Sequence, residues 1–247
     1  DFRRHWLKAR RELFAMSEKT NRADTSFVDA PQVVSRNRVR DHGEVFTAPR
    51  EVNAMLDLVK PETERIESRF LEPACGTGNF LAEILRRKLT AVTQRYAKSR
   101  EEWQRYALLA VTSLYGIDIL ADNVARCRHR LFDLFEEFHR AAFRENCEPR
   151  LAAAALFVLG KNIIWGDALT LRRVDSTDEF IVFCEWSLIG ETQIKRRDFK
   201  FENLLQSAVH DADELFRFAA DNGSEVFLPK PLREYPPTHY LEVAHES

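Results

Sequence analysis

The chain has 247 residues, of which 31% are charged, and its formal net charge of −2 excludes the strongly basic composition of a dedicated nucleic-acid-binding protein. Its four cysteines form no Cys-x-x-Cys pair and its histidines are scattered, so we predict reduced thiols and no metal site. The apolar runs are shorter than a membrane span, and no signal-type stretch follows the basic N-terminus. We therefore expect a cytoplasmic protein without a membrane-spanning segment.

The first 42 residues are predicted to form a basic helical arm and linker, in front of a domain that spans residues 43–247. Residues 2–19 place apolar side chains among basic neighbours, as an amphipathic helix does, whereas residues 20–45 are polar and lack a period. Residues 86–105 carry seven Lys/Arg against two Asp/Glu, and residues 201–247 carry three against nine. This asymmetry fits a surface that faces a polyanion on one side, or ordinary solvated helix faces.

Helical and strand patterns alternate through the middle of the chain. The apolar spacing predicts helices at residues 49–60, 79–98, 101–114, 124–138 and 150–159. Pro61 and Gly160 are the expected stops of the first and the last of these helices. Short apolar runs predict strands at residues 69–73, 114–120, 161–169 and 180–184. Strands that alternate with helices favour a mostly parallel, doubly wound α/β sheet, with the last run as its fourth parallel strand.

The tail departs from this alternation. Residues 199–220 are predicted to be helical, and the proline-rich stretch 225–243 can form only short extended pieces. We therefore expect a sheet that is truncated at its C-terminal edge after four strands, with unpaired backbone groups along that edge. The exposed edge and the amphipathic arm together predict a homo-oligomer or a protein partner.

The stretch FLEPACGTGNFL, residues 70–81, places Gly76 and Gly78 between a predicted strand and a predicted helix. Glycines at this position allow a tight turn and a close approach of the backbone to a ligand. The spacing differs from a dinucleotide-binding fingerprint, because Leu81 stands where a third glycine is expected, and no Gly-Lys-Ser/Thr loop is present. A phosphate-binding loop is therefore disfavoured, and a plain turn remains an alternative.

Three successive predicted strands end in an acidic residue, namely Glu72, Asp118 and Asp167. The carboxyl ends of parallel strands meet at one edge of a sheet, so we expect these side chains to lie together. One acid can hold an amino group, one the two ribose hydroxyls, and one an adenine amino group. This set matches S-adenosyl-L-methionine, which carries all three features and no phosphate. Each acid taken alone would also suit a turn or a helix cap.

Four stretches resemble, in order, the cofactor-binding motifs of N6-adenine DNA methyltransferases, the modification (M) subunits of restriction–modification systems. They are GEVFTAPREVNAMLDLV, FLEPACGTGNFL, YGIDIL and NIIWGDAL, and they cover about residues 43–170. One departure is Ala48, where the family usually has proline. The resemblance implies a Rossmann-like fold that depends on S-adenosyl-L-methionine, with cofactor contacts from Phe46, Thr47, Glu72, Ala74, Cys75, Gly76, Gly78, Asp118, Asp167 and Ala168.

The resemblance also implies a catalytic tetrapeptide, Asn/Asp-Pro-Pro-Tyr/Phe, at the end of the fourth strand, where it binds and stacks on a flipped-out adenine. In residues 171–247 the corresponding place holds Cys184, Glu185, Trp186 and Ser187. Glu185 could replace the acceptor and Trp186 the stacking ring, or Cys184 could be a nucleophile, which no neighbouring motif supports. We favour a third interpretation, in which this region is degenerate, so that cofactor binding is kept and methyl transfer is lost.

The sequence thus predicts a cofactor-binding, DNA adenine methyltransferase-like subunit of a restriction–modification or phage-defence system, with an active methyltransferase as the alternative. The residues after Ser187 are too few for three more strands and a target-recognition region. DNA is the expected partner. The stretch QIKRRDFK either forms a solvated loop or contacts phosphates through Lys195, Arg196, Arg197 and Lys200.

Overall fold

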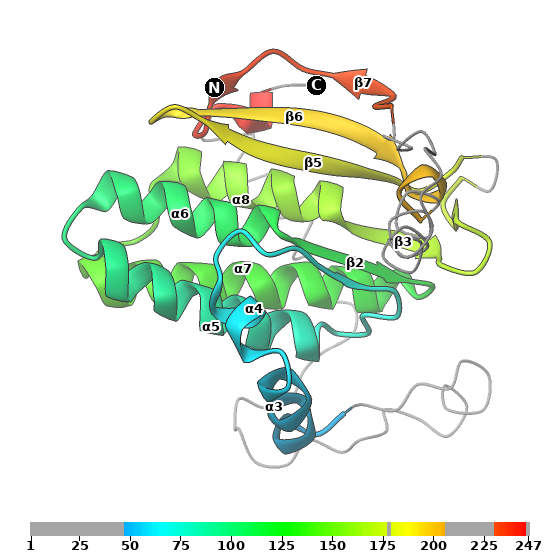
Figure 1. Ribbon diagram of the computed structural model, residues 1–247, viewed down its shortest axis with the longest axis horizontal. Helices are drawn as coiled ribbons and strands as arrows, with labels where there is room; N and C mark the ends of the chain where they lie inside the picture. The colour runs from blue at the N-terminus through cyan, green and yellow to red at the C-terminus, as the bar shows by residue number, and fades with distance from the viewer. Residues whose placement is uncertain (1–46, 177–178, 206–229, 246–247) are drawn as a thin grey trace, which may run out of the picture.

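The computed structural model describes residues 47–176, 179–205 and 230–245, which Figure 1 draws as coloured ribbon. The predicted N-terminal helix and linker lie outside these residues together with Phe46, and so does most of the predicted helix at 199–220. Within them the chain is a mixed α/β protein with a four-stranded, mostly parallel sheet.

The helices of the described part follow the predicted pattern. Ser99 caps α6, where its hydroxyl accepts a hydrogen bond from the backbone N–H of Glu102 at 3.3 Å. Both predicted stops are wrong, because Pro61 lies in the first turn of α4, where proline is tolerated, and α8 continues past the exposed Gly160. The bounds are Pro49–Asp57 (α3), Lys60–Glu64 (α4), Asn79–Tyr96 (α5), Arg100–Thr112 (α6), Ala121–Phe143 (α7) and Pro149–Asn162 (α8).

The parallel part of the first sheet consists of three strands, which lie side by side in chain order. They are β1 (Phe70–Glu72), β2 (Leu114–Asp118) and β3 (Ile163–Asp167). The helix pairs α5–α6 and α7–α8 carry the chain from each strand to the next. The short strand β4 (Arg172–Arg173) then adds antiparallel to β3. The prediction of parallel strands that alternate with helices is therefore confirmed for β1, β2 and β3.

The run at 180–184 does not become a fourth parallel strand. It leads into β5 (Val182–Ile189), which forms an antiparallel hairpin with β6 (Gln193–Lys200). The turn between them contains Gly190 at a φ of 57°. Two short strands of the proline-rich tail, β7 (Arg233–Glu234) and β8 (Thr238–His239), pair with β6. The tail thus supplies short extended pieces, as the sequence predicts, but to a second, antiparallel sheet.

The strand β5 continues through its polar residues because successive side chains point to opposite faces. Cys184 and Trp186 are buried, whereas Glu185 and Ser187, between and after them, are only half-buried. Such alternation is typical of an antiparallel strand, while a continuous apolar run is typical of a buried parallel strand. The five apolar residues at the start of the run hide this alternation, so the sequence predicts a parallel strand where the structure has an antiparallel one.

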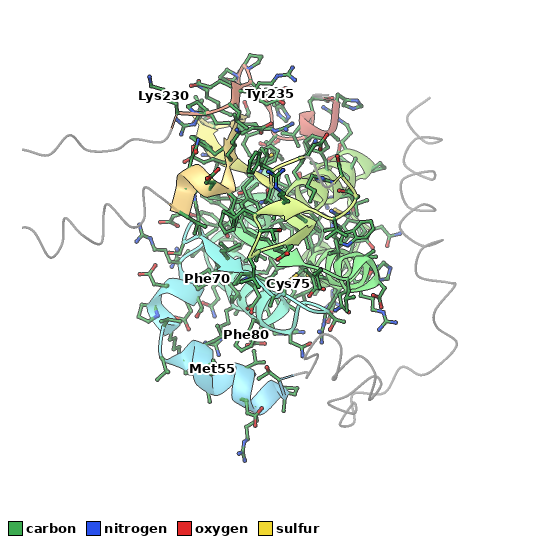
Figure 2. The ribbon with its side chains drawn as sticks, turned by 90° about the vertical axis from the view of Figure 1, so that its right-hand side faces the viewer. Met55, Phe70, Cys75, Phe80, Lys230 and Tyr235 are labelled. Atoms are coloured by element: carbon green, nitrogen blue, oxygen red, sulfur yellow. The ribbon has the colours of Figure 1, made fainter. Side chains whose placement is uncertain are left out.

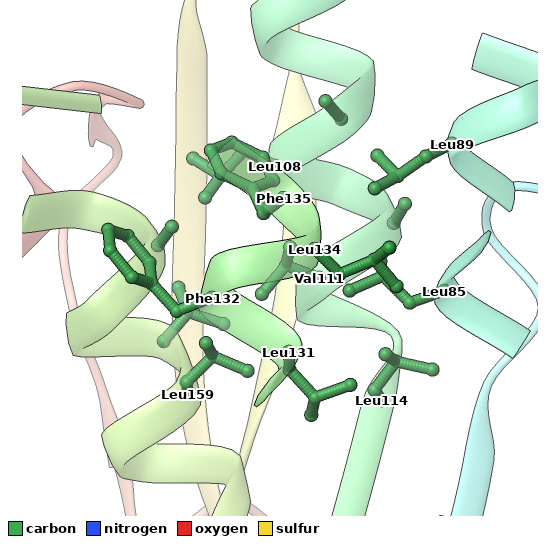
Figure 3. Close-up of a cluster of buried hydrophobic side chains, with 14 of the residues drawn as sticks. Leu85, Leu89, Leu108, Val111, Leu114, Leu131, Phe132, Leu134, Phe135 and Leu159 are labelled. Carbon is green, nitrogen blue, oxygen red and sulfur yellow. The ribbon is translucent and has the colours of Figure 1, made fainter. Parts of the chain in front are cut away.

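The two faces of the parallel sheet are covered by different structures. Leu114 belongs to the main core, which the sheet shares with the helices (Figure 3). On the opposite face, Tyr115 packs edge-to-face on Phe183 with ring centroids 5.3 Å apart. A doubly wound fold has helices on both faces, whereas here the start of the hairpin covers the second face. The residues of this smaller cluster are Tyr115, Ile117, Ile164, Ile181, Phe183 and Phe201.

The main core also joins the parallel-sheet part of the chain to the hairpin and the tail. It contains Leu114 of β2 and Leu159 of α8 together with Trp186 of β5 and Tyr240 of the tail. In Figure 1 the hairpin lies at one end of the molecule next to α6 and α8, and α3 lies at the opposite end. Among the described strands, β1 ends the first sheet, so its outer edge has no strand beside it.

The basic run at 86–105 does not form a continuous charged surface. The ammonium group of Lys88 is buried, and it donates to the carbonyl of Ile66 at 3.1 Å and to the hydroxyl of Ser113 at 2.6 Å. Burial lowers the pKa of Lys88 to about 7. Arg87 is bound to Asp57 at 2.8 Å. Lys88 thus holds α5 to the segments before β1 and β2, and Arg87 holds α5 to α3, which leaves fewer charges for an anionic partner.

Candidate functional site

The glycine loop joins the end of β1 to the start of α5. The Cys75 N–H donates to the carbonyl of Ile117 at 2.9 Å, and the Gly78 N–H donates to the carbonyl of Cys75 at 2.8 Å. Gly76 and Gly78 have φ values of 52° and 82°, in the left-handed region that favours glycine. A Cβ atom on Gly78 would lie 2.6 Å from Cys127 Sγ, so α7 leaves no room for a side chain there. The loop is therefore fixed tightly against β2 and α7.

Asp118, at the end of β2, holds two loops together. Its carboxylate accepts hydrogen bonds from the backbone N–H of Gly76 and of Leu120, both at 2.8 Å. The Asn123 side-chain amide adds a third bond at 3.3 Å. A carboxylate can accept about four hydrogen bonds, so one position remains for a ligand hydroxyl. The structure thus gives this predicted ribose ligand a structural task as well.

Glu72 ends β1 beside the same loop and is half-buried. Burial raises the pKa of its carboxyl group above the usual range. Within the part of the chain that the structure describes, its carboxylate receives no hydrogen bond and no ion pair. A partly desolvated acid without a partner suits a site that a positively charged ligand group completes.

The third strand end is more open. The Asp167 carboxylate accepts from the backbone N–H of Leu169 at 2.8 Å and of Thr170 at 3.4 Å, and the backbone bond lowers its pKa. The half-buried Ala168 follows directly. Two apolar side chains that sequence reasoning missed flank this edge, because Ile119 is 48% and Leu169 94% exposed. Ile119 directly follows Asp118, and Leu169 lies two residues after Asp167. An apolar residue just after a strand-end acid is the sequence signal that could have identified them.

Residues before α3 reach the glycine loop through one polar contact. The half-buried Thr47 accepts a hydrogen bond at its carbonyl from Asn79 Nδ2 at 3.2 Å. Ala48 is the N-cap residue of α3, and its N–H donates to the Glu51 carboxylate at 3.3 Å. Ala74 is exposed and Cys75 is buried, while a hydrogen bond with Cys127 and burial together raise the pKa of the Cys75 thiol. Figure 2 shows Cys75 near the middle of the molecule and Tyr235 at the hairpin end.

The predicted catalytic positions lie at the other edge of the sheet. Glu185 binds Arg69, the residue before β1, at 2.7 Å. Trp186 Nε1 donates to Asn162 Oδ1, the residue before β3, at 3.1 Å. These contacts are at the amino ends of the strands, whereas Asp118 lies at a carboxyl end.

This placement corrects the interpretation of residues 184–187 as a modified catalytic tetrapeptide. The five residues of β2 separate its two ends by about 13 Å at roughly 3.3 Å per residue. Glu185 therefore cannot accept from a base that is held against the cofactor edge, and Trp186 is buried and cannot stack on it. Burial also raises the pKa of the Cys184 thiol to about 12, which removes the nucleophile interpretation. Ser187 is half-buried in the same strand.

The basic residues of QIKRRDFK lie on β6 rather than on a loop. Arg196 is 4% exposed and binds Asp198 through two hydrogen bonds of 2.7 Å, so its predicted phosphate contact is wrong. Lys195 binds Glu234 at 2.7 Å. Arg197 binds Glu185 at 2.6 Å, and the ammonium group of Lys200 lies 4.8 Å from the centre of the Phe180 ring.

A groove of about 930 Å³ runs between α3, α5 and α7, next to the glycine loop. Asn79 belongs both to this groove and to the loop contact with Thr47. Arginines and acids alternate along its walls, which also contain a few apolar side chains. Its lining includes Pro49 of α3, Asn79 of α5, and Arg126 and Arg130 of α7.

The residues that the structure describes contain no group of three or more His, Cys, Asp or Glu side chains that is placed to hold a metal ion. Among the same residues, no helix combines the length and the apolar character that crossing a membrane requires.

Comparison with known proteins returned no matching family model, no matching curated protein and no matching solved structure. A functional proposal for this chain therefore rests on the site and on its sequence motifs.

Proposed function

We propose that the chain binds S-adenosyl-L-methionine at the carboxyl ends of β1, β2 and β3. In this proposal it is the cofactor-binding, adenine DNA methyltransferase-like subunit of a cytoplasmic restriction–modification or phage-defence system, with a Rossmann-like fold. The observation that carries the proposal is the gathering of three strand-end acids at one edge, beside a glycine loop, in the order that the motifs require.

Each part of the edge has a matching part of the cofactor. The unpartnered Glu72 carboxylate suits the positively charged amino group of the methionine part. The remaining acceptor position of Asp118 suits a ribose hydroxyl. The exposed Ile119 and Leu169 suit the two faces of the adenine ring, and Asp167 with Ala168 suits its amino group.

We further propose that this chain does not transfer the methyl group by itself. Among the described residues, no Asn or Asp followed by Pro-Pro lies at the carboxyl edge, and residues 184–187 lie at the opposite one. The acceptor for the target base would then come from a partner that joins the free edge of β1, with DNA as the common ligand. This proposal keeps the interpretation of lost transfer, but for a different reason than a degenerate tetrapeptide.

Titration calorimetry with the full chain tests the proposal. We expect binding of S-adenosyl-L-methionine that Asp118→Asn weakens roughly 10- to 100-fold, as expected for about 1.5–3 kcal/mol from a lost charged hydrogen bond. Asp133→Asn on α7, away from the strand ends, is the matched control and should leave the dissociation constant unchanged. Absence of binding to the wild-type chain at millimolar cofactor would refute the proposed function.

Transfer is tested separately with labelled cofactor and mixed-sequence DNA. We expect no label on DNA with the purified chain alone. Label that appears with the chain alone would contradict the absence of an acceptor. A partner protein that restores transfer would support the idea that the acceptor is supplied at the β1 edge.

A further inference from the structure

We propose that Arg130 is a positioning residue for the cofactor site, although it contacts none of the predicted cofactor ligands. It orients the side-chain amide of Asn79, and Asn79 in turn holds Thr47 beside the glycine loop. This inference rests on the proposed function, because Thr47 is one of the cofactor contacts that the resemblance to adenine methyltransferases implies.

The contacts form a chain across three segments. Asn79 is the first residue of α5 and directly follows the glycine loop. Its Nδ2 donates to the Thr47 carbonyl at 3.2 Å, and its Oδ1 accepts a hydrogen bond from Arg130 Nη1 on α7. The segment before α3 and the helix α7 are thus linked through a single amide.

The polarity of the three groups allows only one orientation of that amide. A guanidinium group can only donate and a backbone carbonyl can only accept, whereas an amide presents a donor on one side and an acceptor on the other. With Arg130 in place, Oδ1 must face α7, so Nδ2 must face Thr47. Without it, the amide can rotate and set its oxygen against the Thr47 carbonyl, which repels the segment from the loop.

The position of Arg130 makes this role testable without disturbing the core. Its side chain is exposed on the wall of the groove between α3, α5 and α7, and it lies outside the main hydrophobic cluster. Arg126 lies on the same wall one helical turn earlier and faces Asp122 at 3.9 Å. It therefore has the same charge in the same groove and serves as the matched control.

The experiment is calorimetry on the full chain with three replacements of Arg130. Arg130→Lys keeps a group that only donates and should stay within about twofold of the wild-type dissociation constant. Arg130→Met removes the donor, and loss of one hydrogen bond should raise the dissociation constant about 5- to 10-fold. Arg130→Glu offers an acceptor, favours the rotated amide and should weaken binding more than methionine does.

Two ligands separate this role from a simple charge effect. S-adenosyl-L-methionine carries a sulfonium charge, and its demethylated product does not. If Arg130 acted only through its charge, Arg130→Glu would strengthen binding of the sulfonium ligand and shift the two ligands differently. Positioning through Asn79 predicts weaker binding of both ligands by the same factor. Arg126→Glu, which changes the same charge without touching Asn79, should leave both nearly unchanged.

The outcomes distinguish the inference from the function on which it rests. A wild-type chain that binds neither ligand refutes the proposed function and this inference with it. If the wild-type chain binds and the methionine and glutamate variants bind with the same affinity as the wild type, the inference alone is overturned. Urea unfolding of each variant shows whether a change in affinity comes with a change in fold stability, and equal stabilities are expected.

Discussion

Alanine at position 78 tests how tightly the glycine loop fits against α7. The new Cβ atom would lie 2.6 Å from Cys127 Sγ, a distance that real Cβ contacts do not show. The φ of 82° adds a second penalty of about 1–2 kcal/mol, because a side chain is unfavourable in the left-handed region. Overpacking a filled interior adds about 1–3 kcal/mol. We therefore expect Gly78→Ala to lower the free energy of unfolding by about 2–5 kcal/mol.

A double variant divides this loss into its two causes. Cys127→Ala removes the sulfur and leaves the Cβ and Cα of residue 127 at 3.4 and 3.5 Å from the new methyl group, which is ordinary contact. In the Cys127→Ala background, Gly78→Ala should then keep only the conformational part, about 1–2 kcal/mol. Urea unfolding of the wild type, both single variants and the double variant measures the coupling.

The coupling decides whether the packing argument is right. A coupling energy of about 1 kcal/mol or more is expected, whereas additivity within about 0.5 kcal/mol would show that the thiol does not fill this space. Gly160→Ala is the control, because nothing lies within 4 Å of its added Cβ in the exposed part of α8. It should raise the free energy of unfolding by about 0.5–1 kcal/mol.

Three further changes give distinct results. Glu72→Gln should stabilise the free protein at neutral pH, since burial raises the pKa of Glu72 and disfavours its charged form. Calorimetry should nevertheless show weaker cofactor binding, and unchanged binding would remove Glu72 from the site. Burial lowers the pKa of His139, so stability should fall as pH drops below about 6.5, where the unfolded chain takes up the proton. His139→Phe should reduce the difference in unfolding free energy between pH 7 and pH 5, and an unchanged difference would contradict the assignment. Arg196→Met should lower the unfolding free energy by about 3–5 kcal/mol, because it leaves the buried Asp198 without its cationic partner. Arg196→Met with Asp198→Leu should recover much of this loss, and a single variant as stable as the wild type would refute the pairing.

The helices and the three parallel strands could be predicted because their signals are local. An apolar period identifies each helix, and a short apolar run followed by a glycine or an acid identifies each strand. The geometry of a parallel sheet then places the strand-end acids at the same edge. These are the parts of the candidate site that the sequence predicts correctly as neighbours.

The rest depends on partners that are far apart in the chain. The run at 180–184 has the composition of a parallel strand, and only its pairing with β6 shows that it belongs to a hairpin. Arg196 has the composition of a phosphate ligand, and only its burial beside Asp198 shows that it does not face solvent. Asn79 and Arg130 meet across 51 positions, which no local pattern reveals. Burial and pairing of this kind arise from tertiary packing and override local composition.

Hydrogen exchange with and without S-adenosyl-L-methionine tests the central claim most directly. The claim places the ligand at the carboxyl ends of β1, β2 and β3, and away from the hairpin strand β5. It predicts that cofactor slows exchange in the backbone at 73–78, 118–120 and 167–170, and leaves 184–187 unchanged. Protection at 184–187 with none at the glycine loop would contradict the claim, because it would place the ligand at the opposite edge of the sheet.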